Sequence, residues 1–174
     1  MAVMTPSTGN VAGPSLTAQD VWHAVSRASF AVLSHVTPAG APRSSGVVYA
    51  VNGDRMLVAV GKDSWKARHI GTDGVVAVTV PVRRGGPLSL LFAIPPATVS
   101  FTGVATIHSG EMLYRIPGLA KLVPPERLAS CVIVDIRPTG HYVTYGLGVP
   151  LLRMRDPARS RARIPVTEVL PQAG

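Results

Sequence analysis

Short apolar segments bounded by glycine, proline, asparagine or serine recur along most of the chain, a pattern that is typical of β-strands. Two of these segments flank Asn52, Gly53 and Asp54, which together form a strong signal for a tight hairpin. The predicted strands cover residues 30–37, 43–51, 55–61, 74–82, 97–109, 130–138 and 140–146. The pattern therefore predicts six or seven strands, mostly antiparallel and joined by hairpins.

Helical spacing of apolar residues interrupts the strand pattern. Val21 and Val25 lie four residues apart, as on one face of a helix, and Thr17 followed by Asp20 resembles a capping box. Helices are predicted at residues 15–29, at 63–71 and, despite Pro117, over most of 110–123. These helices are short, so the fold is expected to be mainly β.

Some predicted strands are apolar on both faces, as in the sequence VVAVTV within residues 74–82. Such strands need cover on both sides, which a closed or half-closed barrel or a dimer interface provides. We expect one barrel domain at residues 15–150. Residues 1–14, rich in glycine, proline, serine and threonine, are predicted to be a flexible arm, and residues 151–174 a basic tail.

Composition narrows the class of protein. A chain of 174 residues with 47% hydrophobic residues has enough apolar surface for one folded domain. It has no apolar run of membrane-spanning length and no secretory signal pattern, so we expect a cytoplasmic protein. Its single cysteine, Cys131, lies in an apolar run and is expected to be a buried thiol. The histidines show no spacing typical of zinc sites, so no metal is expected.

The net charge of +8 indicates either an anionic partner or a solvated basic surface. Arginines crowd residues 153–163, which leaves nucleic-acid binding by the tail as a minor alternative. The chain has no nucleic-acid-binding motif and few aromatic residues on which bases could stack. The sequence between residues 61 and 70, GKDSWKARHI, instead places Lys66 and Arg68 in the first turns of a helix. Cations there indicate either an anion site or an ordinary solvated helix.

The order of these segments resembles the flavin-binding split barrels of the pyridoxamine 5′-phosphate oxidase-like superfamily. TPAGAPRSS at residues 37–45 fits the turn and second strand of that family, and WKARHI at residues 65–70 fits its lysine-containing helix. His69 stands where the family favours asparagine, and the proline that usually precedes the next strand is missing. The resemblance is clearest over residues 17–108. It implies an antiparallel split β-barrel that forms a homodimer, with a cofactor in the groove between the two barrels.

The resemblance also implies a set of cofactor-binding residues. Lys66 and Arg68 would pair with the cofactor phosphate, and Ser64 would donate a hydrogen bond from the helix start. The residues implied beside the ring system or its ribityl chain are Arg43, Ser44 and Ser45, with Val60 and Gly61 allowing the backbone to approach. Strand-edge solvation of the serines and a simple turn at Gly61 are the alternatives.

A flavin carries its own redox chemistry, so no catalytic residue is predicted. The implied function is an oxidoreductase that binds FMN, or alternatively the deazaflavin coenzyme F-420, and transfers hydride to or from a small organic substrate. The apolar segment at residues 83–96 is a candidate lining for a lipophilic substrate pocket, or else packs against the barrel. A flavin-sequestering protein without turnover and a haem-binding relative of this barrel are further alternatives.

Overall fold

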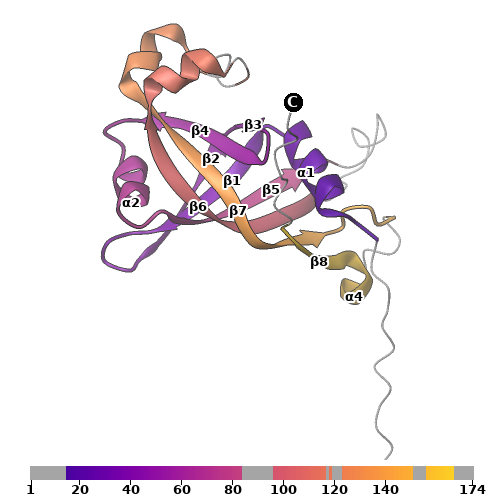
Figure 1. The fold of residues 1–174 in the computed structure, drawn as a ribbon. Helices are drawn as coiled ribbons and strands as arrows, with labels where there is room; N and C mark the ends of the chain where they lie inside the picture. The colour runs from indigo at the N-terminus through magenta and orange to yellow at the C-terminus, as the bar shows by residue number, and fades with distance from the viewer. Residues whose placement is uncertain (1–14, 84–95, 117, 119–122, 151–155, 167–174) are drawn as a thin grey trace, which may run out of the picture.

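The computed structural model describes residues 15–83, 96–116, 118, 123–150 and 156–166, which form a curled antiparallel sheet with short helices around it (Figure 1). The helices are α1 (Ala18–Arg27), α2 (Trp65–Asp73), η2 (Gly110–Arg115), η3 (Pro125–Ser130) and α4 (Pro157–Ser160). The strands are β1 (Phe30–Val36), β2 (Pro42–Val48), β3 (Ala50–Asn52), β4 (Arg55–Gly61), β5 (Val75–Val82), β6 (Ala97–Ser109), β7 (Cys131–Tyr145) and β8 (Arg161–Pro165).

The strand order in the sheet is β2-β1-β5-β6-β7-β4-β3, and β8 pairs with β7. Every pairing is antiparallel, and the two long strands β6 and β7 cross the middle of the sheet (Figure 1). The mainly β antiparallel split barrel predicted from the sequence is confirmed. The boundaries predicted for β4 and β6 are those observed.

Two predicted segments differ in the number of strands that they form, and the predicted ends of β1 and β5 differ from the observed ones by one residue. The segment predicted as one strand at residues 43–51 is divided into β2 and β3 at Tyr49, whose hydroxyl donates a 2.6 Å hydrogen bond to the Val25 carbonyl of α1. Burial of this phenol raises its pKa. The segments predicted as separate strands at 130–138 and 140–146 are one continuous strand, β7, in which Gly140 adopts a φ of 70°. Pairing with β6 continues across this point with a register shift between Ser100 and Thr102.

The main core lies inside the curl of the sheet and is closed by α1. The capping box at Thr17 and Asp20 is confirmed, and it starts the helix so that Val21 and Val25 face the sheet and are fully buried. Trp22 contacts the rings of Phe101 and Tyr142. Burial raises the pKa of Tyr142 to about 12. The ring contacts of Trp22 place α1 against β6 and β7.

A second, smaller core lies on the opposite face of β4 and β7, where Leu57, Val123, Leu128 and Ile133 pack together. The helix predicted at residues 110–123 is, in its described part, the 3-10 helix η2. Residues 117 and 119–122 lie outside the described residues, as do the arm at residues 1–14 and most of the apolar segment at 83–96. Within residues 151–174, which were predicted to be a basic tail, β8 pairs with β7 and is part of the sheet.

Candidate functional site

Helix α2 begins at the capping residue Ser64, whose hydroxyl group can still contact a ligand. Ser64 is the N-cap, and its Oγ accepts a 3.2 Å hydrogen bond from the backbone N–H of Ala67. The hydroxyl proton of Ser64 is left to donate elsewhere, because a hydroxyl both donates and accepts. Ala67 and Ile70 are the buried residues of this helix, which packs against β1, β4 and β6. The start of α2 therefore lies at one end of the barrel.

Two histidines contact each other where α2 meets β1. His35 of β1 lies 3.2 Å, Nε2 to Nδ1, from His69 of α2, and it is 8% exposed. The other ring nitrogen of His35, Nδ1, is buried without a hydrogen-bond partner among the described residues. Burial lowers the pKa of His35, and the charges of His69, Lys66 and Arg43 lower it further. The surroundings of His35 therefore disfavour its protonated form.

The two cations beside His35 lack acidic partners. Arg43 of β2 is the register partner of His35, so both side chains point to the same face of the sheet. Lys66 is half-buried, and burial lowers its pKa. In the part of the chain that the structure describes, neither Lys66 nor Arg43 has a carboxylate within salt-bridge distance. Lys66, Arg43, His35 and His69 thus form a cationic cluster without a protein anion.

Arg68 makes its contacts elsewhere. Its guanidinium donates a 3.0 Å hydrogen bond to the Asp63 carbonyl and lies 5.0 Å from the centre of the Trp65 ring. Trp65 is 71% exposed and also contacts the ring of His69, at 5.8 Å between ring centres. The contacts of Arg68 therefore differ from those of Lys66, although the resemblance implies that both bind one phosphate.

The predicted residues of β2 divide between the two faces of the sheet. Arg43 and Ser45 point to the face of His35, and the buried Oγ of Ser45 has no partner among the described residues. Ser44 points to the opposite face, where its hydroxyl lies 2.7 Å from that of Ser34 on β1. The cationic cluster can thus include Arg43 and Ser45, while Ser44 belongs to the outer face.

The last two predicted cofactor-binding residues, Val60 and Gly61, lie at the end of β4. Val60 is a buried core residue. A Cβ atom added at Gly61 would meet only the Cβ of Ser64, 4.0 Å away, and the backbone there does not require glycine. The space beside Gly61 is therefore open. A ligand that binds to the backbone at this position would need such space.

His35 and Trp65 were not predicted as site residues. His35 follows Leu33 at the period of two that marks the inward face of β1, which is a signal for a polar residue inside the barrel. Its proximity to His69 depends on where α2 lies against β1, and no local pattern reports that distance. The exposed ring of Trp65 has no equivalent signal in the sequence.

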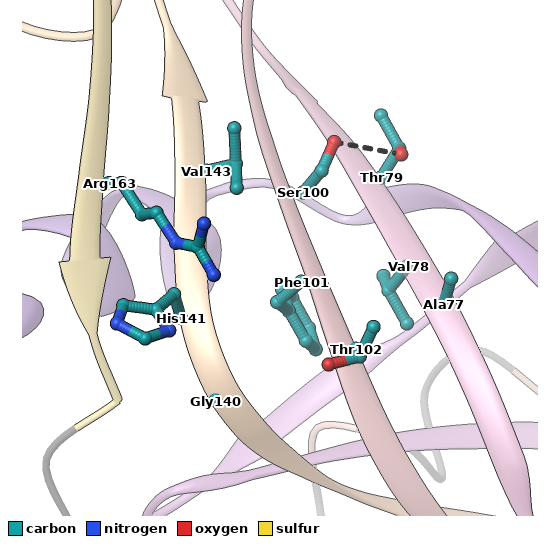
Figure 2. Close-up of a pocket in the computed structure, with 10 residues that line it drawn as sticks. All are labelled: Ala77, Val78, Thr79, Ser100, Phe101, Thr102, Gly140, His141, Val143 and Arg163. Carbon is teal, nitrogen blue, oxygen red and sulfur yellow. Dashed lines mark hydrogen bonds between the residues drawn. The ribbon is translucent and has the colours of Figure 1, made fainter.

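A shallow cavity of about 320 Å³ lies on the outer face of the sheet, over β5, β6, β7 and β8 (Figure 2). Its wall includes the hydroxyls of Thr79 and Ser100, which lie 3.0 Å apart, and His141 and Arg163 stand on its other side. None of the predicted cofactor-binding residues lines it. The cavity therefore lies apart from the cationic cluster within one chain.

Several large apolar side chains are exposed on the outer face of the sheet, and Val143 among them lines the cavity. Those on the outer face of the sheet are Phe30, Val36, Val48, Val75, Val104 and Val143, each 42–56% exposed. In strand pairing, Phe30 is opposite Val48 at one end of the outer face, and Val75 is opposite Val104 at the other end. The hydroxyl pairs Ser34–Ser44 and Thr79–Ser100 lie between them.

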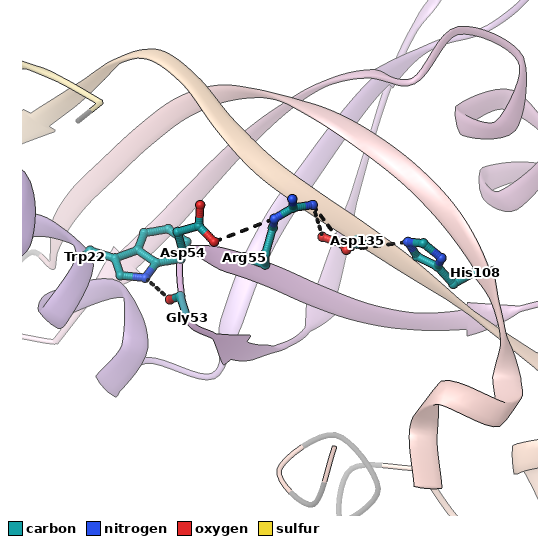
Figure 3. A network of polar contacts seen from close by, with 6 residues as sticks. All are labelled: Trp22, Gly53, Asp54, Arg55, His108 and Asp135. Carbon is teal, nitrogen blue, oxygen red and sulfur yellow. Dashed lines mark hydrogen bonds and ion pairs between the residues drawn. The ribbon is translucent and has the colours of Figure 1, made fainter. Parts of the chain in front are cut away.

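A third polar group of residues, on β4, β6 and β7, has a structural explanation (Figure 3). Asp135 lies 3.4 Å from the Arg55 guanidinium and 3.5 Å from His108 Nε2, and Arg55 lies 3.6 Å from Asp54. The carboxylate of Asp135 is 12% exposed and is satisfied by these partners. We therefore assign this network to stability.

Replacing Asp135 with asparagine should lower the free energy of unfolding by about 1–2 kcal/mol, because Arg55 and His108 lose a shared, mostly buried acceptor. Urea unfolding of the two proteins measures the difference. Asp54→Asn is the matched control: this carboxylate touches the same arginine but is 42% exposed, so we expect a loss below about 0.5 kcal/mol. Equal losses in the two variants would contradict the assignment.

No group of three or more His, Cys, Asp or Glu side chains that could hold a metal ion occurs among the described residues. In the same residues, no helix is long and apolar enough to cross a membrane. The lysine, arginine, imidazole and hydroxyl groups of the cationic cluster are able to bind an anion.

The fold is that of the pyridoxamine 5′-phosphate oxidase-like split barrels, as similar solved structures show. No protein-family model matches the chain, and no curated protein matches its sequence. An F420 reductase has 21% sequence identity and a TM-score of 0.54, with 67% of this chain and 91% of that chain covered. A Listeria innocua protein provisionally assigned as a pyridoxamine 5′-phosphate oxidase has 16% identity, a TM-score of 0.52 and coverages of 70% and 92%.

Haem proteins are also among the similar structures. HutZ, the haem storage protein from Vibrio cholerae, has 13% identity and a TM-score of 0.54, with 74% of this chain and 94% of that chain covered. Identities this low establish the fold and leave the ligand to be inferred from the residues of this chain.

Proposed function

We propose that this protein is an oxidoreductase that binds FMN, or alternatively coenzyme F-420, at the cationic cluster and transfers hydride to or from a small organic substrate. The observation that carries the proposal is the half-buried Lys66 beside Arg43 with no carboxylate partner among the described residues. A half-buried lysine without a carboxylate partner favours the binding of an anion beside it. A cofactor phosphate is such an anion, and the F420 reductase and the oxidase assignment among similar structures support a flavin-type ligand.

The residues present fit a cofactor phosphate in number and in kind. Lys66 and Arg43 would supply positive charge, and Ser64 would donate its hydroxyl proton from the start of α2. Ser45 Oγ and His35 Nδ1, both buried and without a hydrogen-bond partner among the described residues, are further groups that a ligand in this region would contact. Arg68 would have to leave the Asp63 carbonyl to reach the phosphate. A bound flavin or deazaflavin supplies the hydride chemistry, and the protein binds it, orients it and limits its contact with water.

A homodimer is part of the proposal. A second copy of the chain would cover the exposed apolar side chains on the outer face of β1, β2, β5 and β6 with the same residues through two-fold symmetry. The cavity of Figure 2 opens on this face, so the partner would close it. The substrate would then lie between subunits, in apolar surroundings with Arg163 and His141 as polar contacts.

Charge favours neither cofactor decisively. Coenzyme F-420 carries a polyglutamate tail and so more negative charge than FMN, and a chain of net charge +8 suits either ligand. FMN is our first choice because one phosphate matches one cluster of two unpaired cations. The alternative function is a carrier that holds a flavin without turnover. Haem binding is a further alternative, and HutZ is a structural neighbour with that property in its name.

The test is a fluorescence titration of protein stripped of small molecules with FMN, coenzyme F-420 and haem in parallel. We expect saturable binding of FMN or coenzyme F-420, and exchange of electrons between the bound cofactor and a chemical donor or acceptor under turnover. Binding without turnover over a broad substrate panel would support the carrier, and binding of haem alone would overturn the proposal. Size-exclusion chromatography with light scattering on the same samples tests the dimer.

A further inference from the structure

The cavity on the outer face lies at an irregularity in the pairing of β6 with β7. Between two regular register pairs, β6 contributes one residue, Phe101, and β7 contributes three, residues 140–142. Gly140 adopts a φ of 70° there, a backbone conformation that suits glycine. Bulges of this kind redirect side chains and are frequent beside active sites. The redirected side chain is that of His141, which is exposed and lines the cavity.

Four side chains in register form a line across the cavity. Thr79 of β5 is the register partner of Ser100 of β6. Ser100 is in turn opposite Val143 of β7, which is opposite Arg163 of β8. Because register partners point to the same face of a sheet, the line begins at two hydroxyls, crosses an apolar side chain and ends at a guanidinium. All four residues line the cavity (Figure 2).

Arg163 is the permanently charged group of this cavity. Figure 2 shows its side chain extending from β8 over β7. No carboxylate of the described residues lies within salt-bridge distance of Arg163, and no acidic residue is among the described residues that line the cavity. His141, on the same face, adds ring nitrogens that can donate or accept a hydrogen bond. The cavity therefore presents a guanidinium that the described part of the chain leaves without an anion.

The opposite end of the line offers a neutral hydrogen-bond donor. The hydroxyls of Thr79 and Ser100 lie 3.0 Å apart and bond to each other. That bond uses one of their two protons, so the second proton can be donated to an acceptor in the cavity. Between this pair and Arg163, the exposed side chains of Val143 and Ala77 provide apolar surface. A complementary ligand has an anionic end, an apolar body and an acceptor at its other end.

The size and the charge of the cavity narrow the class of ligand. Its volume of about 320 Å³ is at the lower end of the range for small-molecule sites. The paired N–H groups of a guanidinium match the two oxygens of a carboxylate, and one permanent positive charge balances one negative charge. A phosphate dianion is better matched by the two cations of the cationic cluster.

We infer that the outer-face cavity binds a small organic acid, with its carboxylate on Arg163 and its apolar body over Val143. The inference rests on the proposed function only in identifying this acid as the substrate and in assigning closure of the cavity to the partner subunit. The binding of the acid itself requires no flavin.

The first experiment compares acids with their neutral amides. Benzoate, 4-hydroxybenzoate and hexanoate, each paired with its amide, are titrated into protein stripped of small molecules and followed by saturation-transfer NMR. We expect the acids to bind at millimolar concentration or below, and each amide to bind about threefold or more weakly than its acid, because an amide forms no ion pair with Arg163. Equal binding of acids and amides, or no binding of any acid, would overturn the inference.

The second experiment removes the guanidinium. Arg163→Gln should weaken binding of the acids by about threefold to thirtyfold and abolish their advantage over the amides. Arg163→Lys keeps the charge without the planar fork, so its effect should be intermediate. Arg163 is exposed, so we expect the variants to fold, and an unchanged thermal unfolding midpoint verifies this. An unchanged preference for acids in Arg163→Gln would overturn the inference.

Arg161→Gln is the matched control. Arg161 is exposed on the same face of β8, two residues from Arg163, and it is not among the residues that line the cavity. Its replacement makes the same change in net charge, and we expect acid binding to change by no more than about twofold. Equal weakening by the two glutamine variants would overturn the inference, because net charge alone would then explain both.

Two further measurements test other positions for the acid and another role for Arg163. Loss of the acid preference in Lys66→Ala, with retention in Arg163→Gln, would place the acid at the cationic cluster and overturn the inference. Light scattering should give the same mass for Arg163→Gln as for the natural protein. A lower mass with an unchanged acid preference would assign Arg163 to a subunit interface instead.

The outcomes separate the inference from the proposed function. Binding of FMN without any preference for acids would overturn the inference and leave the proposed cofactor in place. A preference for acids that depends on Arg163, in a protein that binds neither FMN nor coenzyme F-420, would retain the acid site and overturn the proposed function.

Discussion

Replacing Lys66 with alanine should weaken FMN binding by about 1.5–3 kcal/mol, or about tenfold to 150-fold in dissociation constant, because a charged hydrogen bond to the phosphate is lost. The effect should exceed that of Arg68→Ala, since Arg68 already donates to the Asp63 carbonyl and lies over Trp65. Fluorescence titration with FMN at fixed ionic strength measures both.

Lys62→Ala is the matched control for this prediction. Lys62 is exposed and precedes the helix, so its loss changes the net charge as Lys66→Ala does without removing a contact of the cluster. We expect its effect on FMN affinity to be within about twofold, as for a screened surface charge. Equal weakening by the two alanine variants would mean that Lys66 acts through net charge only, and the phosphate site would have to lie elsewhere.

Replacing Ile136 with alanine should lower the free energy of unfolding by about 2–5 kcal/mol. Ile136 is fully buried in β7, between its register partners Met56 of β4 and Ala105 of β6. Its Cγ2 fills the space beside Gly103, where a Cβ atom would lie only 2.8 Å away. The cavity left by alanine therefore lies at the centre of the sheet, where the surrounding strands cannot collapse into it easily.

Urea unfolding at one fixed protein concentration measures this loss without a contribution from a changing monomer–dimer equilibrium. Ile136→Val is the graded control, for which we expect about 0.5–1.5 kcal/mol because only one methyl group is removed. A loss below about 1 kcal/mol for the alanine variant would contradict the central position of this side chain in the core.

The local pattern of the sequence predicts elements well and their junctions less well. The boundaries of β4 and β6 follow from alternation and from flanking turn residues, so residues 55–61 and 97–109 were predicted as observed. The division at Tyr49 has a long-range cause, the change of pairing partner from β1, which pairs with β2, to β4, which pairs with β3. The continuity of β7 through Gly140 also depends on pairing, here with β6 and β8. Neither cause is visible in a window of ten residues.

The candidate site shows the same division between local and long-range information. Lys66 and Ser64 could be predicted because they belong to one helix start, and Ser64 does cap it. His35 could not, because its place beside His69 and Arg43 depends on strand register and helix position. Register also separates Ser44 from Ser45, neighbours in sequence that face opposite sides of the sheet. Which of these residues contact a cofactor stays a prediction.

The pairing of β4 with β7 has a consequence for synthesis of the chain on the ribosome. The hairpin of β3 and β4 is complete by Gly61, but the strand that joins it to the rest of the sheet begins at Cys131. Until β7 has left the exit tunnel, the inner edge of β4 has unpaired backbone groups and fully buried positions such as Val58 are open to water. Barrel closure is therefore a late, long-range step, and the nascent chain is open to non-native strand pairing before it.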